Sequence, residues 1–89
     1  MISGTLTVSN RLGLHARAAT RLVNCASGFD SEIRISRGSR SVNGKSIMGV
    51  LTLAAAKGTD LSIDVDGPDE ADAYEALRDL IEERFGEED

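Results

Sequence analysis

The chain is 89 residues long and 40% hydrophobic, so we expect one modest core and no second domain with which to close a deep cleft. Its net charge of −5 is unevenly divided, because residues 1–59 hold eight Lys/Arg and two Asp/Glu whereas residues 60–89 hold two and thirteen. The basic part favours an anionic ligand or an acidic partner. The acidic part, together with an aromatic content of 3%, argues against nucleic-acid binding.

No hydrophobic run approaches the roughly 20 residues that span a bilayer, and residues 1–10 lack the charged and apolar regions of a signal peptide. The single cysteine, Cys25, cannot form an internal disulfide, which fits a reducing compartment. We therefore expect a cytoplasmic protein without membrane insertion. We expect neither a metal nor a cofactor, since the chain has no cluster of Cys and His that could ligate a metal.

Hydrophobic periodicity predicts seven elements in the order βαββαβα. The predicted strands are residues 2–8, 32–36, 40–43 and 61–66, and the predicted helices are residues 16–27, 47–53 and 69–85. Gly28 and Gly86 are expected to end the first and third helices, and Ser46 occupies the N-cap position of the second. The third helix is expected to keep one apolar face as far as Arg84, and residues 87–89 are expected to form a frayed acidic tail.

Residues 13–17 read Gly-Leu-His-Ala-Arg and place His15, the only histidine, just before the first predicted helix. Unpaired backbone N–H groups and the positive end of the helix dipole make such a helix start a site for anions. Histidine can act as a nucleophile toward phosphorus, and Arg17 would lie beside a phosphate on its ring. A helix-capping or solvent-facing histidine is the alternative that these residues leave open.

The segment GLHARAAT around His15 resembles the active-site motif of the HPr family, the small histidine phosphocarriers of the sugar phosphotransferase system. At the family's usual spacing, residues 43–59 (NGKSIMGVLTLAAAKGT) resemble its regulatory serine segment, and residues 66–85 (DGPDEADAYEALRDLIEERF) resemble its last turn and helix. The resemblance implies a single HPr-type domain over residues 1–89. It implies an α+β fold, an open-faced two-layer sandwich in which a four-stranded antiparallel sheet of order 1-4-2-3 carries three helices on one face.

The resemblance further implies that His15 accepts a phosphoryl group on Nδ1 from Enzyme I, which takes it from phosphoenolpyruvate, and passes it to an EIIA-type domain. On this interpretation the protein is a stoichiometric carrier and not an enzyme. Arg17 would stabilise the charge of the transferred phosphate. No Asp or Glu lies near His15 in the sequence, so no acid–base pair is expected beside it. Ala18 stands where the family often has proline, and it would add one backbone N–H to the anion site.

The resemblance also implies that HPr kinase/phosphorylase modifies Ser46. The residues alone favour a structural N-cap, and the two roles are compatible because a helix dipole stabilises a phosphate at its N-terminus. The phosphate would place negative charge beside a possible apolar patch of Ile47, Met48 and Leu51, although Leu51 fits the core equally well. The candidate partner-contact residues are Thr20, Arg21, Ile47, Met48 and Leu51.

We favour a monomeric phosphohistidine carrier over two alternatives. One is a mainly regulatory HPr relative that serves a nitrogen-type relay or catabolite control. The other is a plain α+β adaptor domain whose histidine is coincidental. Labelling with Enzyme I separates this adaptor from the two phosphohistidine hypotheses.

Overall fold

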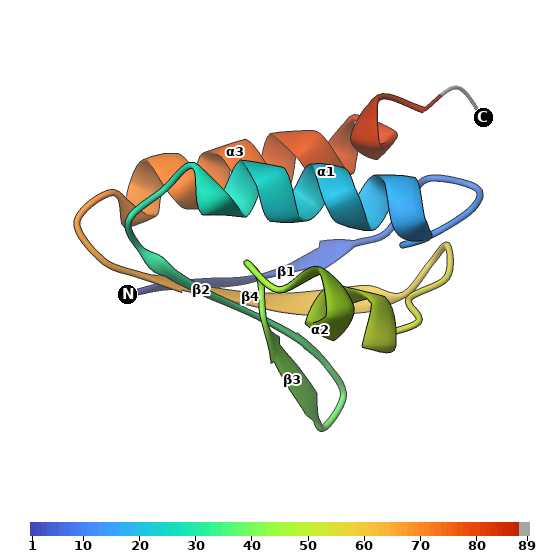
Figure 1. Ribbon diagram of the computed structural model, residues 1–89, viewed down its shortest axis with the longest axis horizontal. Helices are drawn as coiled ribbons and strands as arrows, with labels where there is room; N and C mark the ends of the chain where they lie inside the picture. Colours follow the sequence, from blue (N-terminus) through green and yellow to red (C-terminus); the bar gives the residue numbers. More distant parts are fainter. Residues whose placement is uncertain (88–89) are drawn as a thin grey trace.

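The computed structural model describes residues 1–87, and its elements follow the predicted order (Figure 1). They are β1 (Ile2–Thr7), α1 (Ala16–Ser27), β2 (Glu32–Arg37), β3 (Arg40–Asn43), α2 (Ile47–Thr52), β4 (Asp60–Asp66), α3 (Glu70–Glu82) and the 3-10 turn η1 (Arg84–Gly86). The strands form one antiparallel sheet of order β1-β4-β2-β3, which confirms the predicted α+β fold and strand order.

The sheet has one buried and one open face because polar and apolar residues alternate along its strands. The register pairs Leu6 with Leu61 and Ile35 with Ile63, so apolar side chains of three adjacent strands point to the same side. The opposite face carries Thr5, Thr7, Arg34, Ser62 and Asp64. Among these only Asp64 is partly buried, so this face meets solvent as predicted.

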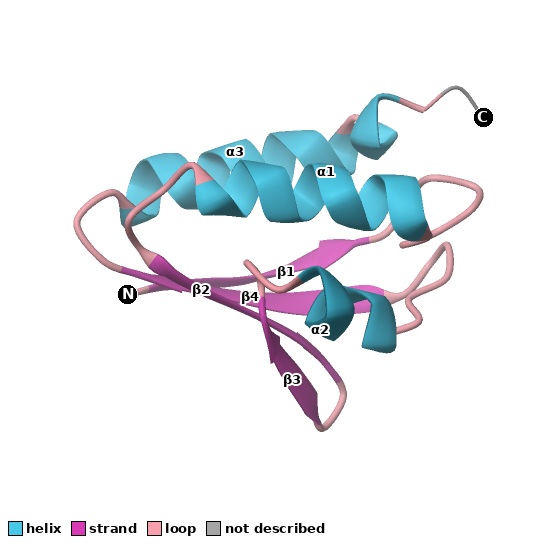
Figure 2. Ribbon diagram, in the orientation of Figure 1, coloured by secondary structure: helices cyan, strands magenta, loops and turns pink. Residues whose placement is uncertain are grey.

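The helices cover the apolar face of the sheet (Figure 2). α1 and α3 lie side by side across it, and α2 packs beside α1. α1 contributes small side chains, including the fully buried Ala18, Ala19 and Ala26, so it can approach the sheet and α3 closely. α3 contributes Leu77 and Ile81, each worth roughly 1.5–3 kcal/mol of hydrophobic stabilisation when fully buried. No helix within residues 1–87 is long and apolar enough to cross a membrane.

The end of α3 differs from the prediction. The helix stops at Glu82, and the chain then turns sharply through three consecutive residues in the left-handed region, Arg84 (φ 57°), Phe85 (φ 56°) and Gly86 (φ 75°). Arg84 is exposed and does not continue the apolar face, whereas Phe85 is 1% exposed and sits in the core. Burial of this ring offsets the cost of the unusual backbone, since left-handed geometry is unfavourable for residues with a Cβ.

Candidate functional site

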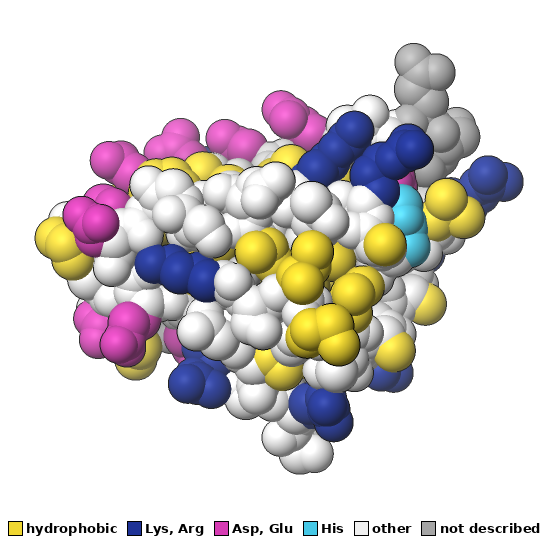
Figure 3. Space-filling view, in the orientation of Figure 1, with side chains coloured by type: hydrophobic (Ala, Val, Ile, Leu, Met, Phe, Trp, Pro, Cys, Tyr) yellow, Lys and Arg dark blue, Asp and Glu magenta, His cyan; other side chains and the backbone are white. Residues whose placement is uncertain are grey.

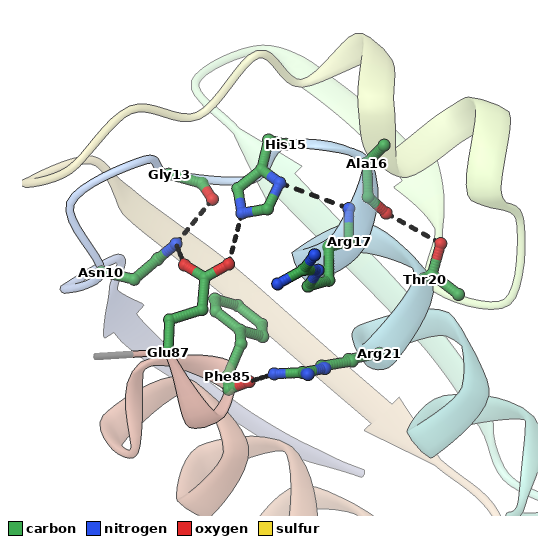
Figure 4. A network of polar contacts seen from close by, with 9 residues as sticks. All are labelled: Asn10, Gly13, His15, Ala16, Arg17, Thr20, Arg21, Phe85 and Glu87. Carbon is green, nitrogen blue, oxygen red and sulfur yellow. Dashed lines mark hydrogen bonds and ion pairs between the residues drawn. The ribbon is translucent and has the colours of Figure 1, made fainter. Parts of the chain in front are cut away.

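His15 is the N-cap of α1, with extended backbone angles (φ −77°, ψ 179°). Its carbonyl accepts the first helical hydrogen bond from the N–H of Ala19 at 2.8 Å. Its ring Nδ1 accepts a hydrogen bond from the N–H of Arg17 at 3.3 Å, which is long for a hydrogen bond of this kind (Figure 4). Nδ1 therefore faces the start of the helix, where the chain offers backbone N–H groups to an anion.

Contacts with residue 55 fix the loop before α1 and thereby orient the imidazole of His15 toward the start of the helix. The N–H of Leu14 donates to the carbonyl of Ala55 at 2.8 Å, and the Leu14 side chain is buried. Gly13 has a φ of +69°, and a Cβ there would lie 2.5 Å from the same carbonyl oxygen. Only glycine fits that close approach, so the Gly-Leu-His order determines where the imidazole lies.

The other edge of the ring meets a carboxylate, which corrects the expectation that no acidic group lies beside His15. Nε2 of His15 contacts Oε2 of Glu87, and the second carboxylate oxygen accepts a hydrogen bond from Nδ2 of Asn10 at 2.8 Å (Figure 4). Glu87 was expected in a frayed tail, yet its side chain is only 11% exposed. Residues 88–89, the rest of that predicted tail, lie outside the described residues.

The surroundings of Glu87 favour its charged form. The pKa of Glu87 lies below its ordinary value, chiefly because Asn10 donates a hydrogen bond to the carboxylate, with further contributions from His15 and from the charge of Arg21. Asn10 is itself fully buried and also donates to the carbonyl of Gly13 at 2.7 Å. Glu87 is therefore an ionised, well-held partner of the imidazole.

The two arginines of α1 differ in what they contact. The guanidinium of Arg21 reaches the turn after α3 and donates to the carbonyl of Phe85. Arg17 is exposed, lies beside the imidazole in Figure 4, and makes no side-chain hydrogen bond or ion pair within residues 1–87.

Thr20 is exposed and donates to the carbonyl of Ala16 at 2.8 Å. Ala18 is fully buried, so its backbone N–H does not reach the surface as the extra anion donor that was expected.

Ser46 is the N-cap of α2, as predicted, and its Oγ accepts a hydrogen bond from the N–H of Gly49 at 3.1 Å. Next to it, Ile47 and Met48 are 38% and 70% exposed. Leu51 is only partly buried and packs against the core, so it belongs to both the patch and the interior. Hydrophobic side chains gather between α1 and α2 on the face shown in Figure 3, and basic side chains flank the histidine there.

The described residues offer neither a metal site nor a reactive thiol. Residues 1–87 contain no group of three His, Cys, Asp or Glu side chains placed to hold a metal ion. Burial raises the pKa of the Cys25 thiol, so this residue is a protonated packing group at neutral pH.

Neither Glu87 nor Asn10 was predicted to act on His15, because both do so through the tertiary structure. Glu87 is 72 residues away along the chain. The signal that could have revealed it is Phe85, a large apolar residue that follows three charged residues and precedes a glycine. Phe85 is buried where the turn η1 packs against α1, and this turn brings Glu87 to His15.

Comparisons with known proteins agree with this architecture. A family model described as the PTS HPr component phosphorylation site matches residues 2–83. The phosphocarrier protein HPr of Neisseria meningitidis serogroup A is 49% identical over 87 residues, which cover 98% of each chain. The crystal structure of HPr-C-His from Thermoanaerobacter tengcongensis has a TM-score of 0.95 at 43% identity and covers 99% of each chain. An HPr dimer from the same organism has a TM-score of 0.79 at 42% identity, covering 98% of this chain and 100% of the other.

Proposed function

Because the chain belongs to the HPr family and is a phosphocarrier of the phosphotransferase system, we propose that His15 accepts a phosphoryl group on Nδ1 from Enzyme I and passes it to an EIIA-type domain. The observation that carries this proposal is the direction of Nδ1, which lies at the start of α1 and makes only a long hydrogen bond to the N–H of Arg17. The protein then acts as a stoichiometric carrier rather than as an enzyme.

A phosphocarrier needs a nucleophile that, once phosphorylated, can pass the phosphoryl group on to the next protein. A phosphoramidate on imidazole is unstable enough for rapid onward transfer, whereas a serine ester is not. When Nδ1 bonds to phosphorus, the phosphate takes the place of the weak contact to the Arg17 N–H and lies near the positive end of the α1 dipole. The exposed guanidinium of Arg17 can then pair with the phosphate oxygens as charge spreads over them.

The partner-contact surface in this proposal is the face that α1 and α2 share. Ile47 and Met48 supply exposed apolar area, and a methionine adapts to several partner surfaces. Arg17 and the other basic side chains near His15 would meet acidic charge on Enzyme I. Thr20 and the exposed edge of Leu51 border this face, while Arg21 contributes its charge although its guanidinium also holds the Phe85 carbonyl.

We further propose that HPr kinase/phosphorylase controls this surface through Ser46. The Ser46 hydroxyl lies directly beside the exposed Ile47 and Met48, so a phosphate there adds negative charge to the docking face. The loss of the Ser46 cap to Gly49 is offset because the helix dipole stabilises the phosphate.

Incubation with purified Enzyme I and labelled phosphoenolpyruvate tests the core of the proposal. An acid-labile, base-stable phosphate on His15, transferable to an EIIA domain, is the expected result. The absence of label would overturn the assignment of His15 as the residue that accepts phosphate from Enzyme I. We place the relay in the cytoplasm and propose a monomeric carrier, which sedimentation equilibrium can check against the dimer described for the Thermoanaerobacter protein.

A further inference from the structure

The contact between Glu87 and His15 goes beyond anchoring the chain, because an ionised carboxylate determines where the imidazole proton sits. A carboxylate only accepts hydrogen bonds, so the ring nitrogen that faces it must carry the proton. Nε2 of His15 faces Glu87, which leaves the lone pair on Nδ1. Nδ1 in turn accepts the hydrogen bond from Arg17, which is consistent with the same tautomer.

Three structural features hold this carboxylate in place. The buried side chain of Asn10 donates a hydrogen bond to one oxygen of Glu87. The turn before Glu87 is fixed by the buried Phe85 and by the hydrogen bond from Arg21 to its carbonyl. The unusual backbone of Arg84 and Phe85 directs the chain back toward α1. Backbone strain of this kind persists only where the surrounding structure enforces it, and here it delivers Glu87 to the imidazole.

We propose that Glu87 is a positioning residue for phosphoryl transfer, which keeps the proton of His15 on Nε2 and stabilises the positive charge that the ring acquires when Nδ1 bonds to phosphorus. This inference rests on the proposed function for its chemical consequence, although its structural part stands on the contact alone.

The step balances without proton transfer to Glu87. The Nδ1–phosphorus bond forms while the bond between phosphorus and the phosphorylated donor protein breaks, and the donor keeps that electron pair. The His15 ring retains its Nε2 proton and becomes cationic, with the carboxylate of Glu87 on one edge and the phosphate on the other. A protonated ring is the better leaving group, so Glu87 keeps the phosphate labile at neutral pH and ready for onward transfer.

The pH range of this effect depends on the charged groups that surround the ring. Arg17 and Arg21 approach from α1, and Glu87 approaches from the turn after α3. Arg11 of the preceding loop and Arg84 of the turn have interactions of their own. Glu87 is the acidic group in contact with the ring among residues 1–87, so its removal leaves the ring among positive charges.

The test compares Glu87→Gln with Glu83→Gln, which removes the same charge from an exposed side chain after α3. Nitrogen NMR of the unphosphorylated proteins at pH 8.5 would report the ring tautomer, and this reading does not depend on Enzyme I. We expect the Nε2–H form to predominate in the parent and in Glu83→Gln. In Glu87→Gln the Nδ1–H form should rise several-fold.

The second reading is the rate of phosphohistidine hydrolysis against pH, after phosphorylation with inorganic phosphoramidate. In Glu87→Gln the profile should move to lower pH, and the phosphate should last several-fold longer at pH 7. Identical tautomers and identical hydrolysis profiles in the two variants would overturn the proposal and make Glu87 a tether alone. Failure of the proposed function would look different, because the parent would then refuse phosphate from Enzyme I whatever its tautomer.

Discussion

The starts of α1 and α2 are built alike but are suited to different tasks. Each has a side chain at the N-cap that accepts a hydrogen bond from a backbone N–H, His15 from Arg17 at 3.3 Å and Ser46 from Gly49 at 3.1 Å. The imidazole has a second edge, which contacts Glu87, and Asn10 in turn donates a hydrogen bond to that carboxylate. Within residues 1–87 the hydroxyl of Ser46 makes only the cap. Because the cap at His15 is long and Glu87 holds the ring independently, Nδ1 can give up its hydrogen bond from Arg17 while the ring stays in position. The cap from Ser46 has no such second contact within residues 1–87, so Ser46 has a structural role until its hydroxyl is phosphorylated.

The largest expected effect is on His15. His15→Ala should abolish phosphate acceptance and cost about 1 kcal/mol of stability, the usual value of an N-cap, because the ring is 30% exposed and adds little to the core. Ser46→Ala, the matched removal of the other cap, should accept phosphate at the parental rate. Labelling with Enzyme I and urea denaturation measure the two quantities, and a labelled His15→Ala protein would refute the assignment of the nucleophile.

Arg17→Ala should slow transfer by about 100- to 1,000-fold, the typical cost of removing one group that stabilises charge in a transition state. Arg34→Ala removes the same charge from the open face of the sheet and serves as the control. Rapid-quench measurements of phosphate transfer compare the two. Equal rates in both variants would show that Arg17 has no such role and would leave the helix start as the sole source of stabilisation.

Ser46→Asp should raise the half-saturating concentration for Enzyme I by roughly two- to fivefold, which corresponds to about 0.5–1 kcal/mol of lost attraction. The increase should shrink as salt increases, since exposed charges more than about 8 Å apart are screened at physiological ionic strength. Aspartate is also an N-cap residue, so α2 should persist. A variant that melts well below the parent, with no change in half-saturation at either salt level, would show that Ser46 acts through the fold.

The start of α3 extends the comparison, because its N-cap residue Asp69 makes no cap to its own helix. Its carboxylate instead accepts hydrogen bonds from the backbone of Asp30 and Ser31, both at 2.9 Å, and from the Ser31 hydroxyl at 2.5 Å. These bonds, the Ser31 hydroxyl foremost, lower the pKa of Asp69 from 3.8. The carboxylate therefore stabilises the fold fully above that value, and the contribution is lost as the pH falls through the lowered pKa.

Asp69→Asn should accordingly reduce the urea midpoint at pH 7, and the difference from the parent should narrow progressively below pH 4. Asp72→Asn, which removes an exposed carboxylate in the first turn of α3, is the control and should change the midpoint little. A difference that stays constant from pH 7 to pH 2 would mean that Asp69 acts by packing and not by its charge.

The smallest expected effect is that of Ala18→Pro. Proline in a first helical turn pre-sets φ and should raise stability by about 0.4–1 kcal/mol through the unfolded state. Ala18 is fully buried, so the ring must fit without displacing its neighbours. Phosphate transfer should change only modestly, since the N–H that is lost does not reach the surface. A large drop in the thermal midpoint would show that the buried site cannot accept the ring.

The sequence was informative wherever a local pattern sets the structure. Alternation along the strands predicted which residues face the core, and the caps at positions 15 and 46 followed from residue type next to helical periodicity. The site was only half predictable, because the carboxylate that completes it arrives through the left-handed turn at Arg84 and Phe85. Continuation of a helix is the local preference of that segment. Only the space left in the finished core, which Phe85 fills, favours the turn.

The strand order has a consequence for how the molecule is made. β1 pairs with β4, so Leu6 cannot pair until Leu61 has been synthesised. The contact of His15 with Glu87 forms later still, because Glu87 follows Leu61 in the chain. Synthesis delivers residues in order, at about 5–20 per second. A growing chain therefore exposes its histidine for several seconds before the sheet closes and the carboxylate arrives. The complete site around His15 therefore forms only after residue 87 has been added.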